Sequence, residues 1–137
     1  MPKSEKRGVK LQCRGIRGAI TVSANNRKGI LAAAKNLLTK MAKANSIETE
    51  DIAAILFTTT SDLNAEFPAA ATRELGWPSS LALLCGHEMN VDGALPRCLR
   101  VLMLVNTTKR SDEIVHVYLG GAKKLKDKPS PAIGGKT

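Results

Sequence analysis

The segment Cys98-Leu-Arg-Val-Leu-Met-Leu-Val105 is apolar at every position except Arg100. A short apolar run that follows Pro96 predicts a buried β-strand. Side chains alternate between the two faces of a strand, so Arg100 shares a face with Leu102 and Leu104. Because burying an unpaired charge is costly, this arginine either reaches solvent or meets a negative partner.

Hydrophobic periodicity around this strand predicts one sheet and one long helix. A stripe of apolar residues with lysines opposite predicts an amphipathic helix over 29–45, preceded by Asn25 and Asn26 as possible caps. A shorter helix is expected over 69–75, ended by Gly76 and Pro78. The predicted strands cover 11–22, 52–60, 79–85, 97–107 and the second half of 111–119.

This order of elements predicts an α+β fold with one sheet, one long amphipathic helix and one short helix. A single helix covers only one face of a sheet. If the other face is also apolar it needs a partner, which a homo-oligomer supplies. Arg100 would then lie near a junction between subunits.

Length and composition limit the class of protein. The chain has 137 residues, 43% of them hydrophobic, which suits one domain with a real core. No apolar run reaches the roughly 18 residues of a membrane span, and no apolar leader segment follows the basic start. Three cysteines without a CxxC pair suit free thiols, so we expect a cytoplasmic protein.

Most of the net charge of +9 lies at the two ends of the chain, where residues 1–10 carry +3 and residues 122–137 carry +4. We expect a disordered basic extension over 1–10, a domain over 11–126 and a flexible C-terminal tail over 127–137. Basic tails can bind nucleic acid. However, aromatic residues make up only 3% of the chain, too few for stacking on bases.

Several polar residues occupy positions that a core would not choose: Arg17, Arg73, Glu88, Arg100 and Tyr118. Each has an ordinary alternative, such as a solvated helix arginine or a carboxylate that caps a turn. If they converge, three arginines and one carboxylate would bind an anion. The absence of a GxxxxGK[ST] loop favours a small carboxylate over a phosphate.

The sequence lacks the signatures of covalent, redox and metal chemistry. It contains no Ser-His-Asp signature, convincing acid pair or cofactor fingerprint, and Cys85 with His87 is too small a set for a structural metal. We therefore expect no cofactor and no metal. The remaining class of reaction is one that is accelerated by orientation and electrostatics.

Four segments, in order and with matching spacing, resemble the AroH-class monofunctional chorismate mutases. They are RGIRGAITV (14–22), FPAAATREL (67–75), LLCGHEMNVDGALPRCLRVLMLV (83–105) and HVYL (116–119). The resemblance runs from about Arg14 to Leu125. It implies an isomerase of the shikimate pathway that converts chorismate to prephenate for phenylalanine and tyrosine biosynthesis. It also implies a homotrimer of α+β subunits with mixed sheets, a pseudo-α/β-barrel core and active sites at the subunit interfaces.

The resemblance also implies roles for individual residues. Arg100 would contact the ether oxygen and a carboxylate, Glu88 would accept a hydrogen bond from the ring hydroxyl, and Arg17 would bind a carboxylate. The further substrate-binding residues would be Tyr118, Cys85 through its backbone, Leu83 and Leu84, with Phe67, Ala69 and Arg73 from the neighbouring subunit and Leu125 on a covering tail.

Three positions depart from the family pattern. Ala70 stands where lysine is frequent, Leu84 where a hydroxyl residue is common, and Lys126 in place of an arginine. Two other functions stay open at this point: a trimer that binds small carboxylates without catalysis, and a nucleic-acid binder that uses the basic tails.

Overall fold

The computed structural model describes residues 10–127, so the expected basic extension and C-terminal tail lie outside the described residues apart from positions 10 and 127. The described elements are, in chain order, β1 (Gln12–Thr21), α1 (Arg27–Ala44), η2 (Thr49–Asp51), β2 (Ile52–Thr59), α2 (Ala70–Glu74), β3 (Ala82–His87), β4 (Cys98–Thr107), η3 (Ser111–Glu113), β5 (Val117–Leu119) and η4 (Gly120–Asp127). The η elements are 3-10 helices.

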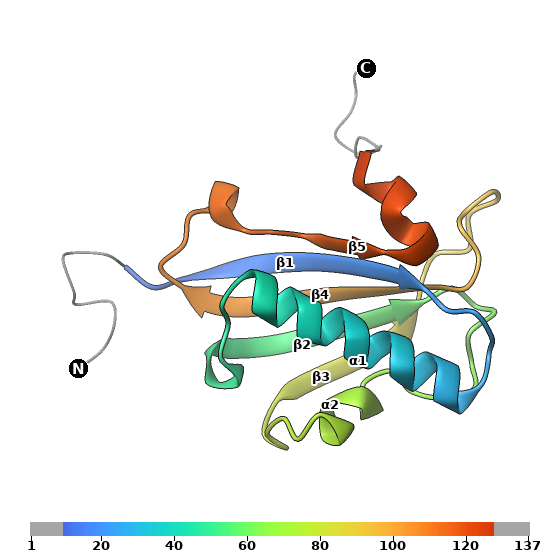
Figure 1. Ribbon diagram of the computed structural model, residues 1–137, viewed down its shortest axis with the longest axis horizontal. Coiled ribbons are helices and arrows are strands. Elements are labelled where there is room, and N and C mark those ends of the chain that lie inside the picture. The colour runs from blue at the N-terminus through green and yellow to red at the C-terminus, as the bar shows by residue number, and fades with distance from the viewer. Residues whose placement is uncertain (1–9, 128–137) are drawn as a thin grey trace.

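The strands form one mixed sheet in the order β3-β2-β4-β1-β5 (Figure 1). β4 lies in the middle and runs antiparallel to both of its neighbours, β1 and β2. The outer strands β3 and β5 run parallel to the strands they pair with. The α+β fold with a mixed sheet, one long helix and one short helix is confirmed, and the apolar run that contains Arg100 is its central strand.

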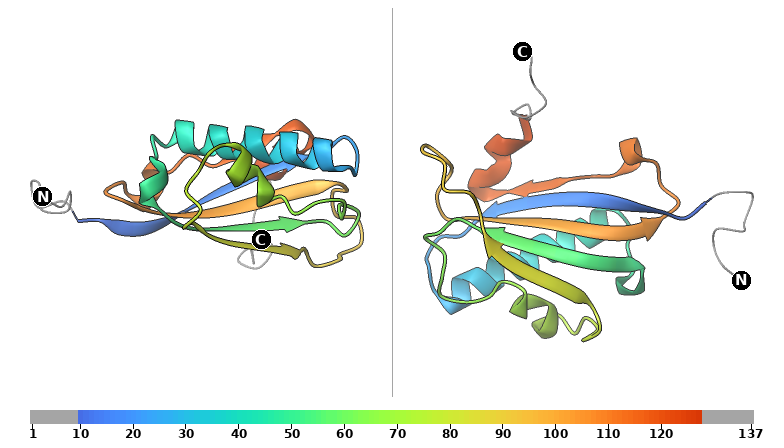
Figure 2. Two further views of the ribbon diagram at one scale, coloured as in Figure 1. Left: turned by 90° about the horizontal axis from the view of Figure 1, so that it is seen from below. Right: turned by 180° about the vertical axis from the view of Figure 1, so that it is seen from behind.

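Helix α1 covers one face of this sheet. Asn26 caps it by accepting a hydrogen bond from the Gly29 backbone N–H at 2.7 Å. α1 lies in front of the sheet in Figure 1 and behind it in the right-hand view of Figure 2. The predicted stripe is fully buried against the sheet, and each large apolar side chain in it contributes about 1.5–3 kcal/mol; its members are Ile30, Ala34, Leu37, Leu38 and Met41.

The opposite face, which we call the open face, is not covered by either α-helix. It carries every second residue of the strands, including Arg100 and Leu102 of β4 and Leu84 of β3. Leu84 is 65% exposed and Leu102 is 37% exposed. At one end of this face, Ala122 of η4 packs with Ala19 of β1 and Cys98 of β4 in a small cluster. The open face therefore combines a charged residue with exposed leucines.

Two elements differ from the sequence-based expectation. β3 starts at Ala82 rather than at residue 79, because Leu81 N–H closes a turn onto the Pro78 carbonyl, and it continues to His87 along β2. The 3-10 helix η4 is not expected from the sequence, and it is held by Gly121 N–H donating to Thr21 Oγ1 at 2.8 Å. No helix in the described part of the chain is long and apolar enough to cross a membrane.

Two glycines on opposite faces of β1 allow a test of how tightly each face is packed. A Cβ atom on Gly18 would meet the buried Met41 and Leu37 side chains, whereas a Cβ on Gly15 would meet the ends of the Leu102 and Leu104 side chains, at 3.2 and 3.8 Å. We expect Gly18→Ala to lower the free energy of unfolding by about 1–3 kcal/mol, as overpacking does. Gly15→Ala, the matched control on the same strand, should change it by less than about 0.5 kcal/mol. Equal losses in urea unfolding would contradict this account.

Candidate active site on the open face

Arg100 lies on the open face of the central strand β4, near the start of that strand. In the sheet register it is opposite Ala19 on one side and Thr58 on the other. Its side chain is 46% exposed, and its Nε lies 3.6 Å from Oε2 of Glu88. The arginine therefore both reaches the surface and meets a carboxylate. Because the pair is half exposed, solvent screens it, and the guanidinium keeps much of its capacity to bind an anion.

Glu88 is held in place by the end of β2. Its backbone N–H donates to the Thr59 carbonyl at 2.8 Å, which extends the pairing of β3 with β2 by one residue. The Thr58 hydroxyl donates to Oε2 of Glu88 at 2.5 Å. Thr58 is also the cross-strand neighbour of Arg100. The carboxylate thus lies over the boundary between β2 and β4.

Arg17 and Tyr118 border the same cavity. Tyr118 of β5 is opposite Ala19, in the cross-strand row that contains Arg100, and Arg17 is opposite Leu102 in the next row. The cavity has a volume of about 330 Å³, within the range of small-molecule sites. Its lining residues are Arg17, Gly18, Leu56, Thr58, Glu88, Arg100, Val101, Leu102 and Tyr118.

The charges in this cavity favour an anionic ligand. Its lining contains two arginines and one carboxylate, an excess of one positive charge. Leu56 and Leu102 supply an apolar wall, which strengthens electrostatic interactions by limiting water. A small carboxylate with an apolar part would match these surfaces.

His116 fixes the backbone beside Arg17. The Arg17 N–H donates to Nδ1 of His116 at 2.9 Å, just before β5 begins. Burial lowers the pKa of His116, and the positive charge of Arg17 lowers it further. Both effects favour the neutral imidazole, which is the form that can accept this hydrogen bond.

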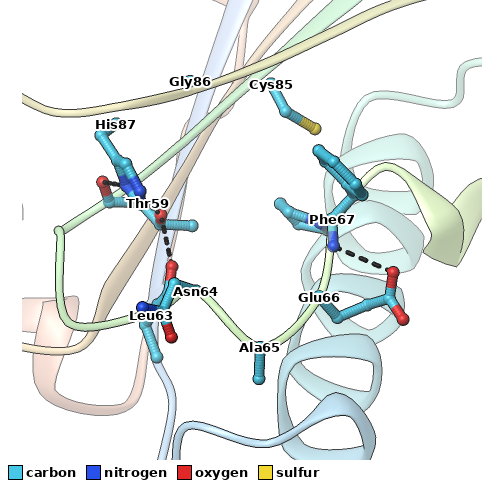
Figure 3. Close-up of a pocket in the computed structure, with 10 residues that line it drawn as sticks. Thr59, Leu63, Asn64, Ala65, Glu66, Phe67, Cys85, Gly86 and His87 are labelled. Atoms are coloured by element: carbon cyan, nitrogen blue, oxygen red, sulfur yellow. Dashed lines mark hydrogen bonds between the residues drawn. The ribbon is translucent and has the colours of Figure 1, made fainter.

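A second cavity, of about 360 Å³, lies between the 63–68 loop and the end of β3 (Figure 3). The Phe67 ring, 71% exposed, and the Cys85 thiol lie side by side there. Burial raises the pKa of the Cys85 thiol. No residue lines both cavities: this one is formed by Thr59, Leu63, Asn64, Ala65, Glu66, Phe67, Pro68, Cys85, Gly86 and His87.

The predicted site residues thus fall into separate groups within one chain. The first cavity brings together Arg17, Glu88, Arg100 and Tyr118. Leu125 of η4 packs with Tyr118 on the Ala19 cluster beside it. The other predicted residues lie elsewhere: Phe67 and Cys85 in the second cavity, Leu83 and Leu84 on the edge strand β3, and Ala69 and Arg73 at α2, which packs against α1.

Thr58 and His116 are not among the site residues expected from the sequence. Thr58 begins a run of three threonines at the end of an apolar strand, and polar residues at a strand end are a usable signal. His116 belongs to the HVYL motif, but its contact with Arg17 depends on the parallel pairing of β1 with β5. That pairing joins segments 99 residues apart, which periodicity cannot detect.

Comparisons with known proteins agree with this architecture. A sequence profile of the family described as chorismate mutase type I matches residues 13–128. A Thermus thermophilus protein described as chorismate mutase AroH is 46% identical over 114 residues, which covers 82% of this chain and 93% of that protein. A Bacillus subtilis (strain 168) protein of the same description is 43% identical over 109 residues, which covers 80% of this chain and 86% of that protein.

A solved structure leads to the same family. The chorismate mutase from Clostridium thermocellum is 51% identical and superposes with a TM-score of 0.79, covering 81% of this chain and 98% of that chain. The resemblance inferred from the four motifs is confirmed by the profile and by both relatives. With a matching fold and a profile that spans most of its length, the chain belongs to the type I chorismate mutase family.

Proposed function

We propose that the protein is an isomerase that converts chorismate to prephenate, with Arg100 as its principal catalytic residue. The observation that carries the proposal is the convergence of Arg17, Arg100 and Glu88 in one cavity with an excess of positive charge. In this rearrangement a C–O bond breaks while a C–C bond forms within the same molecule. The reaction transfers no proton to the protein and needs no cofactor.

Arg100 stabilises the transition state more than the substrate. As the C–O bond breaks, negative charge develops on the ether oxygen. A fixed guanidinium beside this oxygen interacts more strongly with the developing charge than with the neutral ether. The pairing with Glu88 at 3.6 Å orients the guanidinium from one side and leaves other N–H groups for the substrate.

The other groups hold the substrate in its reactive conformation. We assign the substrate carboxylates to Arg17, Arg100 and Tyr118. We assign the ring hydroxyl to Oε1 of Glu88, because the contacts from Thr58 and Arg100 are both made to Oε2. Holding a flexible side chain over a ring converts a rare conformation into the bound one, which lowers the barrier.

We further propose a homotrimer whose active sites lie at the subunit interfaces. The exposed leucines of the open face support a partner surface, and so does the edge strand β3, whose outer backbone groups have no partner within the sheet. Phe67, Ala69 and Arg73, which lie away from the arginine cavity of their own chain, would complete a neighbour's site. Cys85 would join that site with Phe67, because both line one cavity.

In this proposal the catalytic domain covers residues 11–126 of a cytoplasmic protein, and residues 1–10 and 127–137 are extensions of it. Leu125, close to Tyr118, would cover the substrate from the side of η4.

Removing the guanidinium of Arg100 tests the mechanism. We expect the wild-type protein to convert chorismate to prephenate, followed as loss of ultraviolet absorbance. Arg100→Ala should lower kcat by roughly 100- to 1,000-fold, the usual effect of losing one donor to a developing oxyanion. Arg100→Lys should also have a low kcat, since it keeps the positive charge but loses the planar guanidinium.

Arg110→Ala is the matched control, because it removes an exposed arginine that pairs with Asp112 outside the cavity. It should keep wild-type kcat, and circular dichroism should show all variants folded. Normal turnover by Arg100→Ala would refute its role. Binding of chorismate by the wild type without turnover would instead favour a carboxylate-binding protein.

Mixed oligomers test whether sites are shared between subunits. Arg100→Ala and Phe67→Asp should each be nearly inactive, because they damage opposite sides of the proposed junction. Unfolding and refolding the two variants together should restore about a quarter of the wild-type activity if trimers assemble at random. Mixing without unfolding is the control. If co-refolding restores nothing while both variants form trimers, the shared site is wrong.

The dependence of kcat on pH separates this mechanism from acid–base catalysis. Because no group on the protein gives or takes a proton, we expect kcat to be constant between about pH 6 and 9. Steady-state assays in overlapping buffers at constant ionic strength would measure it. A bell-shaped profile centred near neutrality would indicate an acid–base pair and contradict the proposal.

A further inference from the structure

The chain has an unusual backbone conformation directly before the strand that carries Arg100. Arg97 has φ 47°, in the left-handed region that residues with a Cβ atom rarely adopt. Among the described residues only Ser46, with φ 53°, shares this property without being glycine. Such a conformation persists only where its surroundings hold it.

Asp62 makes the contact that holds it. The backbone N–H of Arg97 donates to both carboxylate oxygens of Asp62, at 3.2 and 3.0 Å. The hydrogen bond from the Thr60 hydroxyl lowers the pKa of Asp62, desolvation opposes this shift in part, and the Arg97 N–H lowers the pKa further. Asp62 is exposed, so it adds little packing to the core.

The neighbouring backbone groups are engaged in the same way. The Arg97 carbonyl accepts from Val22 N–H at 2.8 Å. Cys98 N–H donates to the Thr60 hydroxyl at 3.0 Å, and its carbonyl accepts from Thr60 N–H at 3.0 Å. All four backbone polar groups of these two residues therefore have partners, which fixes the angle at which β4 begins.

The segment 58–62 touches both members of the Arg100–Glu88 pair. Thr58 and Thr59 hold Glu88 through a side-chain and a backbone contact. Thr60 and Asp62 hold the start of β4 at Cys98 and Arg97, and Arg100 follows Cys98 by two residues on the same strand. One short segment thus sets the relative position of the two charges.

We propose that Asp62 is a positioning residue for the chorismate mutase reaction, which fixes the location of Arg100 by holding the left-handed backbone of Arg97. This inference rests on the proposed function, in which Arg100 acts on the ether oxygen. Displacing a catalytic group by about 1 Å can cost up to roughly 100-fold in rate. An exposed carboxylate that merely stabilised the fold would leave kcat unchanged in the folded enzyme.

The test uses substitutions at both ends of the contact. We expect Asp62→Ala to lower kcat by about tenfold, with a smaller change in KM, since only orientation at the reacting bond is lost. Asp62→Asn should lower kcat by less, because its amide oxygen can still accept a hydrogen bond from the Arg97 N–H. If Asp62→Ala does not fold by circular dichroism, the comparison is made with Asp62→Asn.

Glycine at the strained position should rescue the loss. Glycine adopts positive φ freely, so the backbone no longer needs Asp62 to hold it. We expect the double variant Asp62→Ala/Arg97→Gly to recover most of the lost kcat. Asp62→Ala/Arg97→Ala is the matched control, because it removes the same arginine side chain but keeps the Cβ atom, and it should not recover.

Two results would overturn the inference: unchanged kcat in folded Asp62 variants, or the same loss in the glycine and alanine double variants. Failure of the proposed function is distinguishable. If the wild type does not turn over chorismate, or Arg100→Ala is fully active, the proposed function fails. If both behave as expected while the Asp62 variants keep kcat, only the role of Asp62 fails.

Discussion

Strand β4 hydrogen-bonds along both edges, to β1 and to β2, and its side chains alternate between the face covered by α1 and the open face. This arrangement buries Leu99, Val101, Met103 and Val105 completely or almost completely. It also forces Arg100 onto the opposite face, in line with Tyr118 and Thr58. The packing of the core and the placement of the charge that we propose to be catalytic are therefore consequences of a single strand. A slip of one residue in its register would exchange them.

The chemistry proposed for this face suits what the chain supplies there. Two arginines and one glutamate in a half-apolar cavity provide charge and orientation without a nucleophile. An intramolecular rearrangement with a polarised transition state is a reaction that such groups accelerate. The contact between Arg100 and Glu88 neutralises part of the charge in the free protein, and it also restrains the guanidinium before the substrate arrives.

The segment 58–62 links this chemistry to the backbone. It ends β2, contacts Glu88 and holds the start of β4 through Thr60 and Asp62. The left-handed conformation of Arg97 has an energetic cost, which local hydrogen bonds offset. Backbone strain of this kind beside a functional residue is expected where position matters more than stability. In this proposal, the position of Arg100 in the site therefore depends on the conformation of the segment 58–62.

Local patterns in the sequence determined the helix and strands, the apolar stripe of α1 and, through four motifs, the family. Such patterns depend on neighbours along the chain, which is why periodicity and capping residues located α1 and β4 to within a few residues. The tertiary structure alone decided that Arg100 pairs with Glu88, that Thr58 joins them, and that Phe67 lies in a different cavity. It also decided the backbone of Arg97 and the helix η4. These features arise from register between strands that are distant in sequence, and register is set by how all the strands pack together.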